Sequence, residues 1–338
     1  MQTFECDRDH TIEGKDLRIT MKLVATVGAA LLAAGLAVPA HAAESEPDLL
    51  AAIAAAAPEV LTGVADASVD LSDRSAVEAS TSEASAILPT KAADGVTLTD
   101  SGGTEITVGL PNATNAENAI AEADGIVSYD NNDGSTTVPV LKEDASVQIT
   151  TVIDGAHAPT RYAYPLQVPA DATVTLDPAS GAVVIVDAEG KFLAGVASAW
   201  AKDANGTDIA THYELDGTTL TQVVEHAEGS AYPIVADPWL GIALVDRTKW
   251  SGKTLQVYPS SWARVNPWAS AGVAARWAGW DEVLNKTPGS RENTPSMRDQ
   301  YYCHFDFVRF RAPNKVSWNL DLGRPAYDYW TLIQRQCN

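Results

Sequence analysis

The stretch VTLTDSGGTEITVGL, residues 96–110, alternates apolar and polar side chains on either side of a glycine pair. This alternation has the period of two that a half-buried β-strand shows. Similar segments follow as SVQITTVI, TRYAYPLQV, ATVTLD, AVVIVD, THYELD and TLTQVV, separated by turn signals such as NNDGS, DPASG, DAEG, DANG and LDG. Eight short strands with no helix between them predict an antiparallel, β-sandwich-like domain over residues 96–237.

The segment before these strands, residues 43–95, has a different composition. It is rich in alanine, serine and acidic residues, lacks aromatic residues, and holds one short helical run, PDLLAAIAAAAPEVL. A segment of this composition can bury little apolar surface. We therefore expect a flexible stalk here.

The N-terminal residues predict export. Met21 and Lys22 precede a 16-residue apolar run, residues 23–38, and Ala40-His41-Ala42 follows as a small-x-small cleavage pattern. These features are typical of a signal peptide over residues 21–42. A retained transmembrane anchor is the alternative, but the run is short for a membrane span, so we expect none to remain. The mature chain would be secreted or at the cell surface, and residues 1–20 would be upstream sequence before a start at Met21.

Charge divides the mature chain into two parts. Residues 43–237 hold 31 acidic and 6 basic residues, a balance of −25, whereas residues 238–338 hold 13 basic and 8 acidic residues, a balance of +5. Eight of the nine tryptophans also lie in the second part. This asymmetry predicts a separate basic, Trp-rich domain, which would meet any anionic partner. The acidic front could shield this domain within the chain.

The C-terminal hundred residues predict a small α+β domain. IALVDRTKW and KTLQVYPSSW indicate two strands, and Asn266-Pro267 is a helix start. MRDQYYCHFDFVRF, residues 297–310, and KVSWNLDL indicate two more strands, and Pro325 begins a final helix. The expected order is ββαββα.

Two cysteines, Cys303 and Cys337, remain in the expected mature chain. In an exported protein they predict one disulfide. Two thiols and one nearby histidine fall short of a tetrahedral metal site, so no metal is predicted. No cofactor is predicted either, since the sequence lacks a phosphate-binding glycine loop.

Residues 297–310 carry the candidate site. Read as a strand, they place Cys303, Phe305 and Phe307 on the core face. Tyr302, His304 and Asp306 then lie together on the outer face. His304 could act as a general acid or base that Asp306 orients, with Arg298 beside them as the third tentative catalytic residue. The candidate binding residues are Tyr302, Arg309, Arg311, Lys315, Trp318 and Arg324. The alternative is a solvated strand face with one salt-bridged histidine.

Two resemblances to known protein segments indicate in which kind of protein this chain belongs. PSMRDQYYCH, SWNLDLGRP and the terminal CN resemble the domain of unknown function 2599 family, found at the C-termini of exported actinobacterial proteins. WAKDANGTDIATHYELDG followed by AYPIVADP resembles the acidic front segment of other exported actinobacterial proteins. The first resemblance implies a module from about residue 250 onwards and no activity. The second implies a display or delivery module.

Three functions stay open, and whether the protein is an enzyme stays open with them. The C-terminal domain could be an effector that acts on nucleic acid or another anionic polymer. It could instead be a non-catalytic module that binds cell-wall glycan or an anionic envelope polymer, or a purely structural domain. The sequence holds no Gly-x-Ser-x-Gly, His-Glu-x-x-His or paired-carboxylate signature that would name a reaction.

Overall fold

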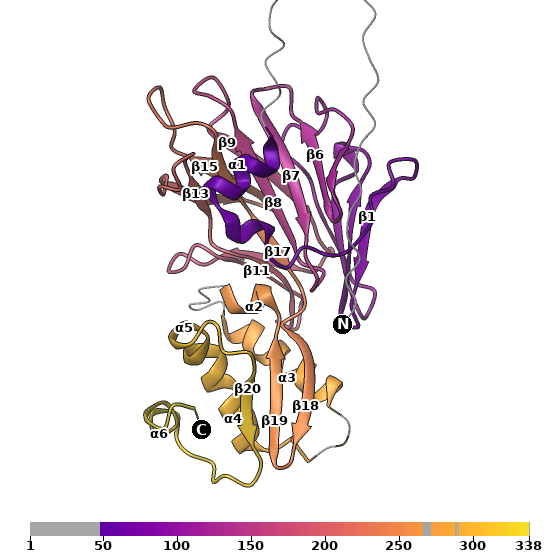
Figure 1. The fold of residues 1–338 in the computed structure, drawn as a ribbon. Coiled ribbons are helices and arrows are strands. Elements are labelled where there is room, and N and C mark those ends of the chain that lie inside the picture. The colour runs from indigo at the N-terminus through magenta and orange to yellow at the C-terminus, as the bar shows by residue number, and fades with distance from the viewer. Residues whose placement is uncertain (1–47, 266–271, 288, 290, 338) are drawn as a thin grey trace, which may run out of the picture. The chain divides into compact units, whose positions relative to one another are not determined.

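The computed structural model describes residues 48–265, 272–287, 289 and 291–337 (Figure 1). The chain divides into two units, residues 1–46 and 47–338, and all that follows concerns the second. The predicted upstream sequence, signal peptide and cleavage near Ala42 lie outside the described residues. No helix within the described ranges has the length and apolar character that crossing a membrane requires.

The front of the chain is built from two antiparallel sheets. The first has the strand order β1-β2-β3-β4-β9-β15-β14. Its strands are β1 (Ser75–Ser80), β2 (Ala84–Pro89), β3 (Val96–Asp100), β4 (Glu105–Val108), β9 (Arg161–Gln167), β14 (Thr211–Asp216) and β15 (Thr219–Val224). In β9 every second side chain is buried, as the alternation predicts.

The second sheet has ten strands, with the main order β10-β11-β12-β17-β8-β7-β6-β5; in addition β16 pairs with β8, and β13 pairs with β16. Its strands are β5 (Ile120–Ala123), β6 (Ile126–Asp130), β7 (Ser135–Leu141), β8 (Val147–Ile153), β10 (Thr173–Leu176), β11 (Val183–Val186), β12 (Phe192–Val196), β13 (Trp200–Lys202), β16 (Ile234–Asp237) and β17 (Trp239–Gly241). One cluster of buried residues includes Leu98 and Tyr164 from the first sheet and Ile149 from the second. The antiparallel, β-sandwich-like front is confirmed.

Residues 49–94 differ from the expected flexible stalk. They form α1 (Leu49–Ala56), η1 (Pro58–Leu61), β1, β2 and η2 (Ala92–Asp94). Ile53 and Val60 are fully buried against Val138 and Val152 of the second sheet. Composition was misleading because small alanine side chains let a short helix lie close to a sheet, so this segment buries apolar surface without any aromatic residue.

The C-terminal region is a small α+β domain, as predicted, in which β18-β19-β20 form an antiparallel sheet. Its elements are β18 (Val245–Ser251), β19 (Thr254–Pro259), α2 (Ser261–Val265), α3 (Gly272–Lys286), α4 (Pro295–Cys303), η3 (His304–Val308), α5 (Arg309–Arg311), β20 (Trp318–Asp321) and α6 (Tyr329–Gln334). The helix start expected at residues 266 and 267 lies outside the described residues. The disulfide between Cys303 and Cys337 is present.

The predicted third strand, residues 297–310, is wrong, because this stretch is helical throughout as α4, η3 and α5. Thr294 caps the helix by accepting a hydrogen bond from the Met297 backbone N–H, and Pro295 is the first helical residue. Met297, Tyr301 and Phe305 recur at spacings of four residues and are fully buried. The domain order is therefore ββ, several helices, β and α, not ββαββα.

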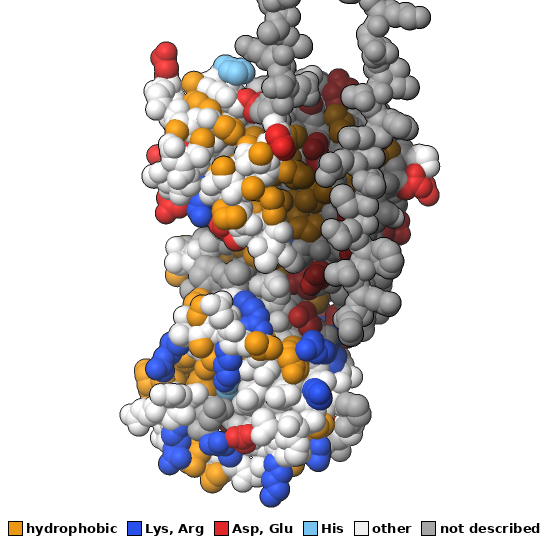
Figure 2. Space-filling model, viewed as in Figure 1, with side chains coloured by type: hydrophobic (Ala, Val, Ile, Leu, Met, Phe, Trp, Pro, Cys, Tyr) orange, Lys and Arg blue, Asp and Glu red, His pale blue; other side chains and the backbone are white. Residues whose placement is uncertain are grey.

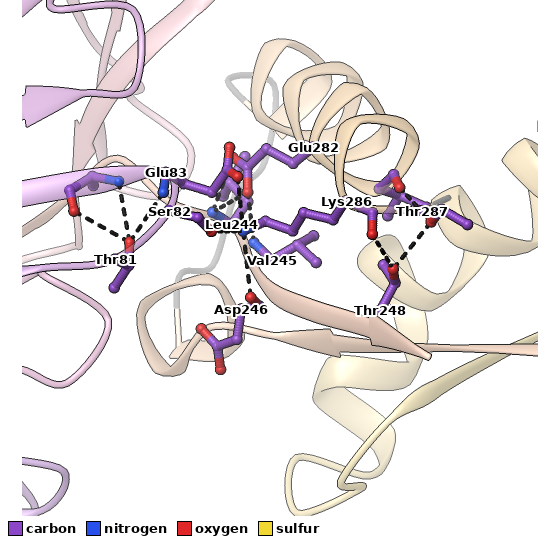
Figure 3. Close-up of polar contacts among 12 residues, drawn as sticks. Thr81, Ser82, Glu83, Leu244, Val245, Asp246, Thr248, Glu282, Lys286 and Thr287 are labelled. Carbon is purple, nitrogen blue, oxygen red and sulfur yellow. Dashed lines mark hydrogen bonds and ion pairs between the residues drawn. The ribbon is translucent and has the colours of Figure 1, made fainter. Parts of the chain in front are cut away.

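Side chains of α3 join the C-terminal domain to the front sheets (Figure 3). Lys286 forms an ion pair with Glu83, at 2.9 Å, and donates a hydrogen bond to Ser82. The Glu282 carboxylate accepts hydrogen bonds from the backbone N–H groups of Leu244 and Val245. The Glu282 contacts lie within the C-terminal domain, whereas Lys286 contacts the turn between β1 and β2 through an ion pair that is largely shielded from solvent.

Candidate functional site

His304 is buried, so the prediction that it faces solvent is wrong. Its exposed fraction is 0%, and its ring lies 6.3 Å from that of Trp318. Nδ1 lies 2.8 Å from the backbone oxygen of Gln300, which can only accept, so Nδ1 carries the proton. The ammonium of Lys315 is 3.2 Å from Nε2 and can donate to it. Burial lowers the pKa of His304 to about 4, so the ring is neutral near pH 7.

Asp306 points away from His304 and belongs to a different group of side chains. Residues two apart in a helix project from nearly opposite sides, whereas in a strand they would share a face. The Asp306 carboxylate accepts a hydrogen bond from Arg276 Nη1 at 2.7 Å and another from the Tyr329 hydroxyl. The Arg276 guanidinium in turn lies 4.6 Å from the centre of the Tyr302 ring.

Arg298 lies with this second group. It pairs with Asp299 at 3.2 Å, and its guanidinium is 5.7 Å from the centre of the Tyr302 ring. Arg324 instead pairs with Asp321, whose backbone N–H donates to Gln300 on the His304 side of α4. The helix therefore separates the candidate residues: His304 and the binding candidate Arg324 lie with one set of neighbours, and Asp306 and Arg298 lie with another.

The remaining predicted binding residues differ in their access to solvent. Trp318 and Arg309 are buried, and the Arg309 guanidinium lies against the rings of Phe305 and Phe310. Arg311 is exposed and, with the half-buried Lys315, lines a cavity of about 290 Å³ that Cys337 also borders. Of the predicted set, Arg311 and Arg298 are the cations most open to a partner.

The outer face of the β18-β19-β20 sheet carries a polar surface that our sequence analysis missed. Leu255, Val257 and Leu320 are buried on the inner face. The residues between them form cross-strand pairs on the other face, Arg247 with Tyr258, and Lys249 with Gln256, which also pairs with Asn319. The alternation of buried and accessible positions in TLQVYP was the signal that could have found this surface.

This outer face presents two cations, Arg247 and Lys249, together with the carboxylate of Asp321, which pairs with Arg324. The Arg247 guanidinium lies 3.8 Å from the centre of the Tyr258 ring. Within the described ranges neither Arg247 nor Lys249 forms an ion pair, whereas Arg276, Arg298 and Arg324 each pair with an aspartate. Figure 2 shows Lys and Arg side chains spread over the C-terminal domain, while acidic side chains gather on the front sheets.

A metal site finds no support in the part of the chain that the structure describes. There, no three side chains of His, Cys, Asp or Glu come together in a way that could hold an ion. The polar groups described above are instead engaged with one another or face solvent.

Comparison with protein families finds a match for the C-terminal domain. Residues 245–338 match the family described as "Protein of unknown function (DUF2599)", which confirms the resemblance seen in the sequence. Over 99 residues the chain is 39% identical to Uncharacterized protein Rv0477 of Mycobacterium tuberculosis (strain ATCC 25618 / H37Rv) and to Uncharacterized protein Mb0487 of Mycobacterium bovis (strain ATCC BAA-935 / AF2122/97). This stretch covers 28% of the chain and 65% of each relative, so the chain spans less than two thirds of the curated relatives it matches. No solved structure matches.

Proposed function

We propose that the C-terminal domain binds an anionic polymer, a nucleic acid or an envelope polymer, through the outer face of the β18-β19-β20 sheet. The observation that carries the proposal is the pair of cations beside the Tyr258 ring, Arg247 and Lys249, which form no ion pair within the described ranges. A guanidinium stacked on an aromatic ring keeps its N–H edge free for a phosphate or carboxylate. Gln256 and Asn319 add uncharged hydrogen-bonding groups in the adjacent row.

Binding is favoured over catalysis because of the state of His304. A general acid or base works best with a pKa near the working pH and with access to substrate. His304 is buried, both of its ring nitrogens have protein partners, and its pKa is lowered to about 4 by burial. These observations support a positioning role for His304 within the core, between α4 and Lys315.

The proposal extends to the setting of the chain. In it, the chain is secreted or displayed at the cell surface after cleavage near Ala42, and the acidic front delivers or shields the basic domain. The Glu83–Lys286 ion pair supports the shielding idea, because it brings an acidic side chain of the front to a basic side chain of the domain. A disulfide also suits an oxidising, extracellular compartment.

The test uses residues 43–338 and three probes: polyphosphate, single-stranded DNA and a sulfated glycan. A double substitution, Arg247→Ala with Lys249→Ala, should weaken binding at least about tenfold and lower the slope of log affinity against log salt by about two. The matched control is Lys91→Ala, which removes one exposed cation from the acidic front. Affinity that does not change in the double variant, or that changes as much in the control, would refute the proposed surface.

A further inference from the structure

A cavity of about 730 Å³ lies in the unit formed by residues 47–338, between η1 and α2. Its floor includes the side chains of Trp200, Trp239 and Gln148, from β13, β17 and β8. Glu59 and Thr62 border it on the η1 side, and Ser261 and Arg264 of α2 border it opposite. Neither the front domain nor the C-terminal domain alone supplies this set of walls.

Strand register puts the polar and aromatic groups of the floor on one face of the sheet. Trp200 pairs directly with Asp237, and Trp239 pairs directly with Gln148. Directly opposed residues share a face, and so do Asp237 and Trp239, two positions apart along one strand path. α1 and η1 cover this same face farther along, at Val152 and Val235 (Figure 1). The cavity lies where that cover ends.

One polar side chain of the floor, Gln148, is held from behind by a buried acid. Gln148 Nε2 donates to Asp237 Oδ2 at 2.6 Å, and within the described ranges the Gln148 side chain makes no other hydrogen bond. Asp237 Oδ1 and Thr150 Oγ1 do not line the cavity; they lie on the paired strands β16 and β8 and are buried with no hydrogen-bond partner among the described residues. Burial raises the pKa of Asp237 to about 8, against the lowering effect of its hydrogen bond from Gln148. Buried polar groups are normally hydrogen-bonded, so the rest of the Gln148 amide calls for a polar ligand or water.

The charged groups around the cavity are already engaged. Arg264 donates to the backbone oxygens of Pro313, Lys315 and Val316. Lys142, beneath Trp239, donates to the backbone oxygens of Val60 and Thr62. Glu59 pairs with Lys202 at 3.0 Å. An anion or a cation would have to displace one of these contacts, whereas a neutral ligand would not.

We propose that this cavity binds a neutral sugar unit of a glycan. A sugar ring presents an apolar C–H face, which would stack on the indole of Trp200 or Trp239, and a rim of hydroxyl groups. The hydroxyl groups would pair with the Gln148 amide, which can both donate and accept and which the Asp237 carboxyl group behind it orients. The cavity volume falls within the range of small-molecule sites, about 300–1,000 Å³. This site is separate from the cationic sheet face and does not depend on it.

The experiment titrates residues 43–338 with N-acetylglucosamine and with its disaccharide, followed by tryptophan fluorescence and by saturation-transfer NMR of the sugar. We expect saturable binding with a dissociation constant in the millimolar range or tighter. Gln148→Leu, which keeps the volume, and Trp200→Leu should each weaken it about tenfold or more. The matched control is Trp277→Leu, an exposed tryptophan of α3 that does not line the cavity.

Thermal unfolding of each variant shows whether the fold is kept, and Gln148→Glu provides a second substitution at the floor should Gln148→Leu fail to fold. Parallel titrations use indole as an apolar probe and inorganic phosphate as an anionic one. The proposal is overturned if neither sugar binds the wild-type chain saturably. It is also overturned if Trp277→Leu weakens binding as much as Trp200→Leu does, or if indole or phosphate binds this cavity more tightly than the sugars.

Discussion

The front sheets and the C-terminal domain each enclose an ionisable side chain, and burial acts on the two in opposite directions. Asp237 in the front is 1% exposed, and burial raises its pKa to about 8. His304 in the C-terminal domain is 0% exposed, and burial lowers its pKa to about 4. Each group is therefore neutral near pH 7, since low polarity disfavours the charged form of either.

These two groups should therefore respond at opposite ends of the pH range. Glu282 of the C-terminal domain, whose pKa burial also raises to about 8, acts in the same direction as Asp237. An acid with a raised pKa loses stability to the unfolded chain as pH rises from about 4 to about 8, because only the folded state keeps the proton. A base with a lowered pKa loses stability as pH falls from about 6.5 to about 4, because only the unfolded state takes up the proton. Taken together, these two groups should make the free energy of unfolding highest at an intermediate pH, between about 4 and 8.

The largest expected change in stability comes from a substitution in the core that buries His304. Phe305 is fully buried, and its ring contacts those of Tyr301 and Trp318. Phe305→Ala should lower the free energy of unfolding of the C-terminal domain by about 4 kcal/mol, because it leaves a cavity. Urea unfolding followed by tryptophan fluorescence measures it, since eight of the nine tryptophans lie in residues 238–338. The control, Phe310→Ala, removes a half-exposed ring and should cost far less; an equal loss would contradict the assigned core.

The disulfide gives the next largest effect, and it should act on the C-terminal domain alone. Cys303 and Cys337 are 34 residues apart and join the end of α4 to the end of the chain. Replacing both by alanine should cost about 3 kcal/mol, because the unfolded chain regains the entropy of an open loop. Mass spectrometry after alkylation of the native protein checks the bond itself. Two reactive thiols in the unreduced protein would contradict it.

Much of the front fold could be predicted from the sequence, because strand alternation reports directly which face of a sheet is buried. The strands from residue 96 onwards follow that pattern, as β9 shows. Residues 49–94 could not be predicted this way, because their alanine-rich helix is stabilised only by the sheet on which it packs. Such a helix has little stability alone, and its composition resembles that of a solvated segment.

The candidate site was only partly predictable, because its geometry depended on one choice of secondary structure. Both a strand and a helix suit the apolar residues of the stretch 297–310, and the spacing of Met297, Tyr301 and Phe305 was the helical signal. The Thr294-Pro295 pair before them was a second signal. The disulfide could be predicted without either helical signal, since the expected mature chain holds only two cysteines. The cations of β18 were visible in the sequence, but their position on one face beside Tyr258 was not.

A pH titration of stability sharpens the comparison directly. His304→Gln keeps a side-chain N–H for the Gln300 carbonyl and removes the titrating ring. The wild-type domain should lose on the order of 2 kcal/mol between pH 6.5 and pH 4, and the variant should lose less by that amount. Asp237→Asn is the mirror-image test, since it should flatten the loss between pH 4 and pH 8. Identical pH profiles for wild type and His304→Gln would contradict a neutral, buried His304.

The smallest effect comes from the ion pair that joins the two regions, Glu83 with Lys286. Their side chains are 15% and 9% exposed, so water screens the pair less than it would at an open surface. A double-mutant cycle with Glu83→Gln and Lys286→Met isolates the pairwise free energy, and we expect about 1 kcal/mol. Lys286 also donates hydrogen bonds to Ser82 Oγ and to the backbone oxygen of Asp246. The single Lys286→Met change should therefore lower the free energy of unfolding more than Glu83→Gln does. If the coupling is real, salt should weaken it and the C-terminal transition should shift relative to that of the front. A coupling energy near zero, with both transitions unmoved, would mean that this ion pair does not couple the stabilities of the two regions even though they are in contact.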